Sequence, residues 1–141
     1  MSPLLTDTTG WAEAGYDPET IRDAEARNAA MRRFLSSPLG PHLEAVTDGE
    51  GEEVGGGFLL SATEIAEETA PGTTGADLLA RGYLPVWNDG GDLIVYGVEE
   101  AAFFLAEHTF EDRVVRLSDD PPETFFAKLR DHDQNLGGRL P

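Results

Sequence analysis

The sequence has no cysteine and very few cations, and both shortages exclude classes of protein. Without cysteine the chain forms no disulfide, no thiolate metal site and no cysteine nucleophile. Ten lysine and arginine residues stand against 27 acidic residues, which gives a net charge of −17. Binding of nucleic acid or of an anionic membrane requires clustered cations, so we expect neither as a partner.

Long apolar runs are also missing. No stretch approaches the roughly 20 apolar residues that a membrane span needs. The first ten residues contain no cation and no long apolar segment, so they do not form a secretory signal. We therefore expect a cytoplasmic protein, and the excess of arginine over the single Lys128 suggests a high-GC bacterium. At 141 residues the chain is long enough for one domain with its own core.

The clearest local pattern is a hairpin around Asp89-Gly90-Gly91-Asp92. Two runs rich in β-forming residues, 83–88 and 93–96, flank this cluster. The two glycines tolerate a positive φ, and Asp89 can accept hydrogen bonds from the backbone of the turn. The second run, Leu-Ile-Val-Tyr, is continuously apolar, which predicts a central strand covered on both faces.

Start signals predict a helix near each end of the chain. Asp17 as N-cap and Pro18 in the first turn begin one helix, which ends before 36–41. Asp120 as N-cap, followed by proline and an acidic residue, begins the other. Its apolar face consists of Phe125, Phe126 and Leu129.

Shorter elements are expected between these helices and the hairpin. Residues 57–60 predict a short strand, and Ser61 with Glu64 forms a capping box for a helix over 62–69. Residues 73–80 fit either a further helical turn or a loop.

The segment after the hairpin allows two interpretations. Residues 99–107 are rich in helix formers, but Phe103-Phe104-Leu105 lies between turn-like segments, so a strand over 102–108 is also possible. Residues 113–117 predict another strand. The whole pattern indicates a single α+β domain over 17–131, with helices packed on a mostly antiparallel meander. An N-terminal arm, 1–16, attached through Trp11 and Tyr16, and a C-terminal tail, 132–141, flank this domain.

Acidic charge is concentrated in the middle of the chain. Residues 41–112 carry 16 acidic residues and Arg81 alone, a local net charge of −15. Within them, the acidic and glycine-rich residues 48–53 predict a solvated, mobile loop. An EF-hand is rejected, because Glu53 stands where that calcium loop needs glycine and Leu59 where it needs its final acid. Such a surface attracts basic proteins, although the same charge can serve solubility alone.

Motifs for catalysis are missing. The chain has no G-x-S-x-G, no P-loop lysine and no H-E-x-x-H, and its three histidines lack metal-ligand spacing. Glu107-His108 with Glu111 and Asp112 is only a remote candidate for a divalent ion. A hydrolase with Asp89 and Asp92 as its carboxylates remains an alternative, but these residues flank a turn. We expect no enzymatic activity, no cofactor and no metal.

Four segments resemble the SUKH superfamily, the domain of the fungal Smi/Knr-type cell-wall regulators. The match covers roughly 58–129. Residues 57–65, Gly-Phe-Leu-Leu-Ser-Ala-Thr-Glu-Ile, are similar to its strand-into-helix step, and the hairpin of 83–96 is similar to its central glycine-rich hairpin. Residues 103–108 and 123–129 are similar to its next strand and closing helix. The first helix of the family is at best a remnant at 30–35, and the hairpin has one glycine fewer than many members.

This resemblance implies a protein-interaction domain without catalysis. Bacterial members look like immunity proteins encoded beside polymorphic toxins, many of them nucleases, so the expected partner is a cognate basic toxin domain. An intracellular scaffold or regulatory domain, as in the fungal relatives, is the alternative. The acids near the predicted turns are the candidates for partner binding: Asp89, Asp92, Glu99, Glu100, Glu107, Glu111 and Asp112, with Glu50, Glu52 and Glu53 behind them.

Overall fold

The computed structural model describes residues 4–45, 51–54, 56–107 and 114–131. The strands are β1 (Glu52–Val54), β2 (Gly57–Leu59), β3 (Tyr83–Asn88), β4 (Leu93–Gly97), β5 (Ala102–Ala106) and β6 (Val114–Ser118). The helices are α1 (Pro18–Leu35), α2 (Gly40–Ala45), α3 (Ala62–Glu68), α4 (Thr74–Ala80) and α5 (Pro122–Asp131). None of these described helices is long and apolar enough to cross a membrane.

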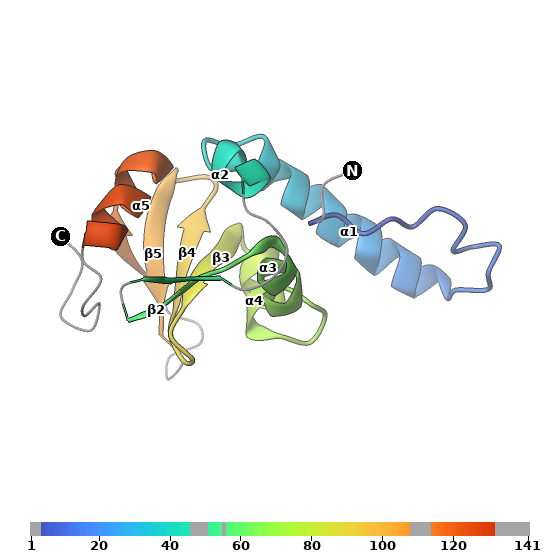
Figure 1. The fold of residues 1–141 in the computed structure, drawn as a ribbon. Helices are drawn as coiled ribbons and strands as arrows, with labels where there is room; N and C mark the ends of the chain where they lie inside the picture. The colour runs from blue at the N-terminus through green and yellow to red at the C-terminus, as the bar shows by residue number, and fades with distance from the viewer. Residues whose placement is uncertain (1–3, 46–50, 55, 108–113, 132–141) are drawn as a thin grey trace.

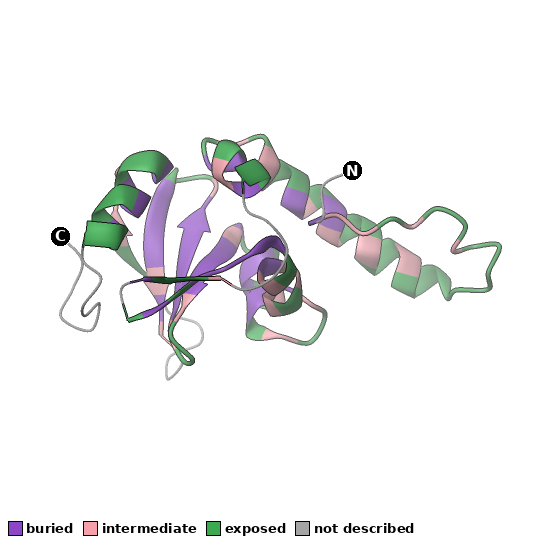
Figure 2. Ribbon diagram, viewed as in Figure 1, coloured by how far each residue is buried: buried purple, intermediate pink, exposed green. Residues whose placement is uncertain are grey.

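The six strands form one antiparallel sheet in which each strand pairs with the next along the chain (Figure 1). The expected α+β domain with an antiparallel meander is therefore confirmed. The predicted hairpin is its centre, because β3 and β4 pair from Tyr83 opposite Gly97 to Asn88 opposite Leu93. All five residues of β4 are buried, as a strand covered on both faces requires (Figure 2).

One face of the sheet carries the main core. Trp87, Tyr96 and Phe103 pack there with Phe125 and Phe126 of α5, and α1 adds Met31 and Phe34. The rings of Phe103 and Phe125 stack with centroids 3.9 Å apart. The predicted apolar face of the last helix is thus the surface that covers the sheet, as the position of α5 beside β5 in Figure 1 illustrates.

The opposite face has a smaller apolar cluster. Val95 of β4 and Phe104 of β5 alternate with the core residues of their strands and pack near Leu78 of α4. Residues 73–80, left open between helix and loop, form α4, whose N-cap is Thr73. The hydroxyl of Thr73 accepts a hydrogen bond from the Ala76 N–H at 3.1 Å.

The N-terminal arm lies along α1, which projects away from the sheet in Figure 1. The buried Leu4 and the side chain of Asn28 attach it: Asn28 accepts from the Thr6 N–H at 2.8 Å and donates to the Thr6 carbonyl at 2.7 Å. Trp11 and Tyr16 stack on each other, and Tyr16 is exposed. Attachment through Leu4 and Asn28 was missed in the sequence, because neither residue belongs to a turn or cap motif.

Residues 99–107 form a turn and a strand, not a helix. β5 runs from Ala102 to Ala106 and pairs with both β4 and β6. Helix propensity is a weak preference, and here burial of Phe103 and Phe104 on opposite faces of the sheet decides the structure. His108 lies outside the described residues.

Two predicted boundaries are wrong. Glu52 and Glu53 were expected in a mobile loop but belong to β1, which pairs with β2. The last helix begins at Pro122, two residues beyond Asp120, and the Pro121 carbonyl accepts its first hydrogen bond, from Phe125. Asp120 does not cap the helix; its carboxylate accepts from Lys128 at 2.8 Å.

Candidate functional site

The meander brings alternate turns to the same end of the sheet. Val54 pairs with Gly57, Asn88 with Leu93, and Ala106 with Val114, so the connections after β1, β3 and β5 share one end. We call this the hairpin end. The connection between β4 and β5, at Val98–Ala101, lies at the opposite end because Gly97 pairs with Ala102.

The β3–β4 turn at the hairpin end is closed by its own side chains. Asp89 Oδ1 accepts hydrogen bonds from the N–H groups of Gly91 at 3.0 Å and Asp92 at 2.8 Å. Asn88 Oδ1 accepts from the Gly90 N–H at 3.1 Å. Gly90 has a φ of +96°, which a residue with a side chain rarely adopts. The predicted turn role of Asp89 is confirmed.

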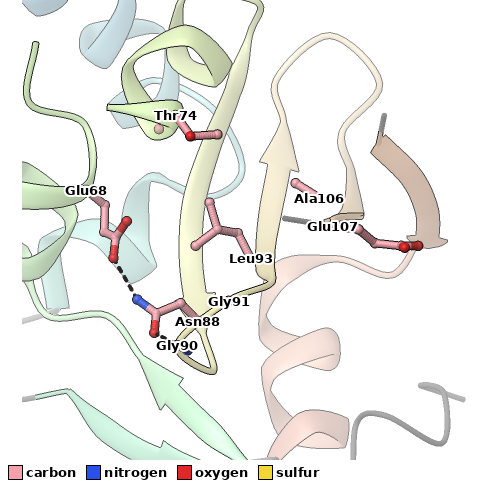
Figure 3. Close-up of a pocket in the computed structure, with 9 residues that line it drawn as sticks. Glu68, Thr74, Asn88, Gly90, Gly91, Leu93, Ala106 and Glu107 are labelled. Carbon is pink, nitrogen blue, oxygen red and sulfur yellow. Dashed lines mark hydrogen bonds between the residues drawn. The ribbon is translucent and has the colours of Figure 1, made fainter. Parts of the chain in front are cut away.

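A small pocket opens beside this turn, with a volume of about 280 Å³ (Figure 3). Its lining residues come from the end of α3, the start of α4 and the ends of β3, β4 and β5. They are Glu68, Thr74, Gly75, Asn88, Gly90, Gly91, Leu93, Ala106 and Glu107. Leu93 and Ala106 give it an apolar floor, whereas Glu68 and Asn88 form a polar wall.

Glu68 is the most distinctive side chain in this pocket. Asn88 Nδ2 donates to its Oε1 at 2.7 Å. Burial raises the pKa of the Glu68 carboxyl; the bond from Asn88 opposes this, and the nearby carboxylates of Glu64 and Glu67 add to it. Glu107 lines the same pocket, but its carboxylate points away from the Glu68–Asn88 pair in Figure 3. The pocket therefore presents one half-buried carboxylate and not a facing pair.

Local sequence explains why Glu68 reaches this position. The predicted capping box begins α3: Ser61 accepts from the Glu64 N–H at 3.2 Å, and Glu64 accepts from the Ser61 N–H at 2.9 Å. At the other end of α3, the Thr73 hydroxyl donates to the Glu68 carbonyl at 2.8 Å. These bonds fix both ends of the helix and hold Glu68 above the end of β3.

No protein-family model, curated protein or solved structure matches this chain. In the part of the chain that the structure describes, no group of three or more His, Cys, Asp or Glu side chains is placed to hold a metal ion. The remote metal candidate at Glu107 involved His108, Glu111 and Asp112, which lie outside the described residues.

The predicted partner-binding acids are divided between several places. Asp89, Asp92 and Glu107 lie at the hairpin end, while Glu99 and Glu100 lie at the opposite end. Glu99 forms an exposed ion pair with Arg33 of α1 at 3.6 Å. Two further candidates, Glu52 and Glu53, lie on β1, and three, Glu50, Glu111 and Asp112, are outside the described residues.

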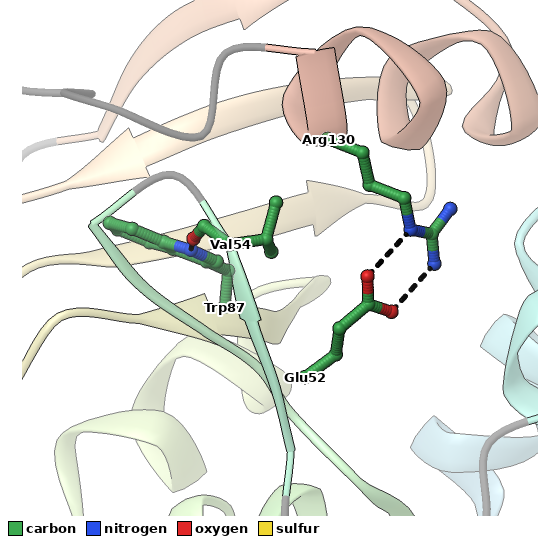
Figure 4. A network of polar contacts seen from close by, with 4 residues as sticks. All are labelled: Glu52, Val54, Trp87 and Arg130. Atoms are coloured by element: carbon green, nitrogen blue, oxygen red, sulfur yellow. Dashed lines mark hydrogen bonds and ion pairs between the residues drawn. The ribbon is translucent and has the colours of Figure 1, made fainter.

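The two candidates on β1 differ in their surroundings. Both are exposed, but Glu52 is also bound by Arg130 of α5, whose Nε donates to Oε2 at 2.9 Å and Nη2 to Oε1 at 3.1 Å (Figure 4). This two-bond pair joins the edge of the sheet to the last helix. The Glu52 carboxylate thus already has a cationic partner within the chain.

His42 lies close to this ion pair. Its ring stacks on Phe126 with centroids 4.1 Å apart, and its Nε2 is buried without a hydrogen-bond partner. Burial, and secondarily the positive charge of Arg130, lower the pKa of His42 to about 4, while Glu52 opposes the shift. His42 therefore has a packing role.

We expect the chain to lose stability as the pH falls from 6.5 towards 4. In this range the unfolded chain protonates His42 while the folded chain keeps it neutral, so acid favours unfolding. Allowing for the partial exposure of the ring, the loss should be about 2 kcal/mol. Urea unfolding of the wild type at pH 7 and pH 4.5 measures it.

His42→Phe is the matched control, because it keeps the ring on Phe126 and removes the titrating group. The difference in unfolding free energy between the variant and the wild type should then increase as the pH falls. The Glu52–Arg130 pair remains in both proteins, so its own acid sensitivity cancels. An equal pH dependence in both proteins contradicts the assigned environment of His42.

A second, larger cavity of about 680 Å³ lies between the arm, α1, α3 and α4. Alanine is the commonest residue in its walls, and Leu4, Trp11 and Leu79 are the larger apolar residues there. Arg27 crosses between its sides, donating to the Leu4 carbonyl at 3.0 Å and to the Thr69 hydroxyl at 2.7 Å. These bonds connect the N-terminal arm to the end of α3 through Arg27.

Proposed function

We propose that this chain is a non-enzymatic protein-binding domain that neutralises a basic partner, as an immunity protein does. The observation that carries the proposal is the collection of carboxylates at the hairpin end. These carboxylates lie on three neighbouring segments there: Asp89 and Asp92 in the β3–β4 turn, Glu107 after β5, and Glu68 at the end of α3. The described segments that form this end, 53–54, 56–58, 62–75, 86–94, 105–107 and 114–115, contain no lysine or arginine.

Charge of this kind acts on association in a known way. A surface of one sign speeds encounter with a partner of the other sign, and it discriminates against partners of like charge. A nuclease toxin has a basic active site because it holds phosphate. An acidic domain that covers such a site gains both in association rate and in complementarity.

The resemblance to the SUKH superfamily supports the same function from a different direction. It rests on the hairpin around Asp89-Gly90-Gly91-Asp92 and on the strand-into-helix step at Ser61. Members of that superfamily act by binding proteins, and bacterial ones look like toxin-neutralising proteins. A regulatory scaffold, the alternative, would bind its partner without inhibiting it, so the activity of the bound partner separates the two functions.

Co-purification with the product of the adjacent gene, followed by a salt titration of the dissociation constant, tests this function. We expect affinity to fall as salt screens the acidic surface. Glu67→Gln combined with Glu107→Gln should weaken binding by up to about fivefold per charge, the range for exposed ion pairs. A toxic partner should also lose its activity in the complex.

Glu19→Gln combined with Glu25→Gln is the control, because it makes the same charge change on exposed residues of α1. It should leave binding nearly unchanged. Equal effects of the two double variants would assign the attraction to net charge and not to the hairpin end. Binding that is indifferent to salt would overturn the proposal.

A further inference from the structure

We propose that the pocket between α3, the β3–β4 turn and β5 receives one long cationic side chain, arginine or lysine, with its charged end on Glu68. This inference rests on the proposed function and names the chemistry of its central contact. Its cavity of about 280 Å³ falls just below the range of about 300–1,000 Å³ typical of small-molecule sites. A cavity of this size can accommodate one long side chain.

The lining matches the two parts of such a side chain. Arginine and lysine have an apolar stem that packs on apolar surface and a charged end that seeks a polar partner. Leu93 and Ala106 provide apolar surface at the base of the pocket, and Glu68 projects from its wall. The stem therefore lies over the ends of β4 and β5 while the cation meets the carboxylate.

The charge around Glu68 is uncompensated within the described chain. Its hydrogen-bond donor there is the neutral amide of Asn88, and its charged neighbours are Glu64 and Glu67. None of the described cations forms an ion pair with it. A partner's cation would thus meet a half-buried carboxylate already oriented by Asn88, and charge-assisted bonds of this kind are the strong ones.

Other ligand classes fit less well. The described residues offer no set of three metal-ligating side chains. An anion in the pocket would lie against the Glu68 carboxylate and be repelled by it. The C-terminal end of α3 and the N-terminal end of α4 both border the pocket, so their opposite partial charges largely offset each other and leave the carboxylate to set the sign.

Two short peptides test the pocket without any partner protein: acetyl-Gly-Arg-Gly-amide and the same peptide with neutral citrulline in place of arginine. NMR titration should give saturable shifts at the Asn88 side-chain amide and the Leu93 methyl groups with the arginine peptide. Citrulline should bind at least tenfold more weakly. Equal binding of the two peptides, or no saturable shift at these groups, overturns the proposal.

Glu68→Gln keeps the shape of the side chain and removes its charge. It should therefore weaken binding of the arginine peptide at least tenfold. Glu67→Gln makes an equal charge change on the exposed neighbour and should change the affinity for the arginine peptide less than twofold. If Glu68→Gln does not fold, Thr74→Arg replaces it, because a cation on this exposed lining position should occupy the pocket and compete with the peptide. Unchanged peptide binding in the variant that folds contradicts the pocket.

Binding measurements with the basic partner protein show whether the cation in the pocket belongs to that protein. If Glu68→Gln weakens binding of the partner protein at least tenfold, the cationic side chain in the pocket comes from that protein. If the partner binds normally to Glu68→Gln but responds to the exposed charge variants, the inference fails while the proposed function stands. If the arginine peptide binds and no basic protein does, the pocket takes a free guanidinium or amine and the proposed function fails.

Discussion

Replacing Trp87 with alanine should lower the free energy of unfolding by about 3–5 kcal/mol, the usual cost of removing a buried aromatic side chain. Trp87 is 1% exposed and belongs to the core beneath the sheet. Its indole Nε1 also donates to the Val54 carbonyl at 2.8 Å, which joins β3 to β1 (Figure 4). The variant loses this packing, and the Val54 carbonyl loses its indole donor. Urea unfolding followed by circular dichroism measures the loss.

Two further variants separate these contributions. Trp87→Phe keeps an aromatic ring but removes the donor, so it should cost about 1–3 kcal/mol, the range for losing a buried hydrogen bond together with some packing. Trp11→Ala, at the only other tryptophan, removes a partly exposed ring that stacks on the exposed Tyr16 and should cost less than about 1 kcal/mol. A Trp87→Ala cost no larger than that of Trp11→Ala would refute the described core.

The hairpin that Trp87 belongs to was predictable because its determinants are adjacent in sequence. Glycine at a turn, Asp89 beside it and apolar β-formers on both sides specify a local structure. The capping box at Ser61 and Glu64 is predictable for the same reason. In these elements each signal and its effect lie within a few residues.

β1 and the pocket were not predictable, because distant residues create them. Glu52 and Glu53 read as a loop by composition, yet the strand is held by Trp87 at Val54 and by Arg130 at Glu52, 78 residues away. Glu68 and Asn88 are 20 residues apart and carry no shared motif. The one available signal was the run of acids at the end of a predicted helix.

The division of the acids between two ends of the sheet follows from topology alone. In an antiparallel meander, successive turns lie at opposite ends, so Asp89 and Glu99 cannot share one end. The predicted fold therefore already separated the predicted partner-binding residues into two groups. Their local partners, such as Arg33 beside Glu99, needed the packing of α1 to be known.

Gly75→Ala should cost about 3 kcal/mol or more, because it forces two backbone segments apart. Gly75 is buried in the first turn of α4, and a Cβ at this position would lie well inside 3.0 Å of the Glu68 carbonyl oxygen. Overpacking commonly costs about 1–3 kcal/mol when side chains can adjust. Here the obstacle is backbone, fixed in turn by the Thr73 hydroxyl at 2.8 Å, so α3 and α4 must separate.

Thr74→Ala is the control, since it changes an exposed neighbour in the same turn and should stay within about 0.5 kcal/mol of the wild type. Thermal unfolding gives both values, and the Asn88 side-chain amide signal reports whether Glu68 has moved. If Gly75→Ala folds with that signal displaced, binding of the arginine peptide should weaken even though every charge is retained. An unshifted Asn88 signal and wild-type stability would show that α3 and α4 do not approach as closely as described, and the wall of the pocket would then need a different origin.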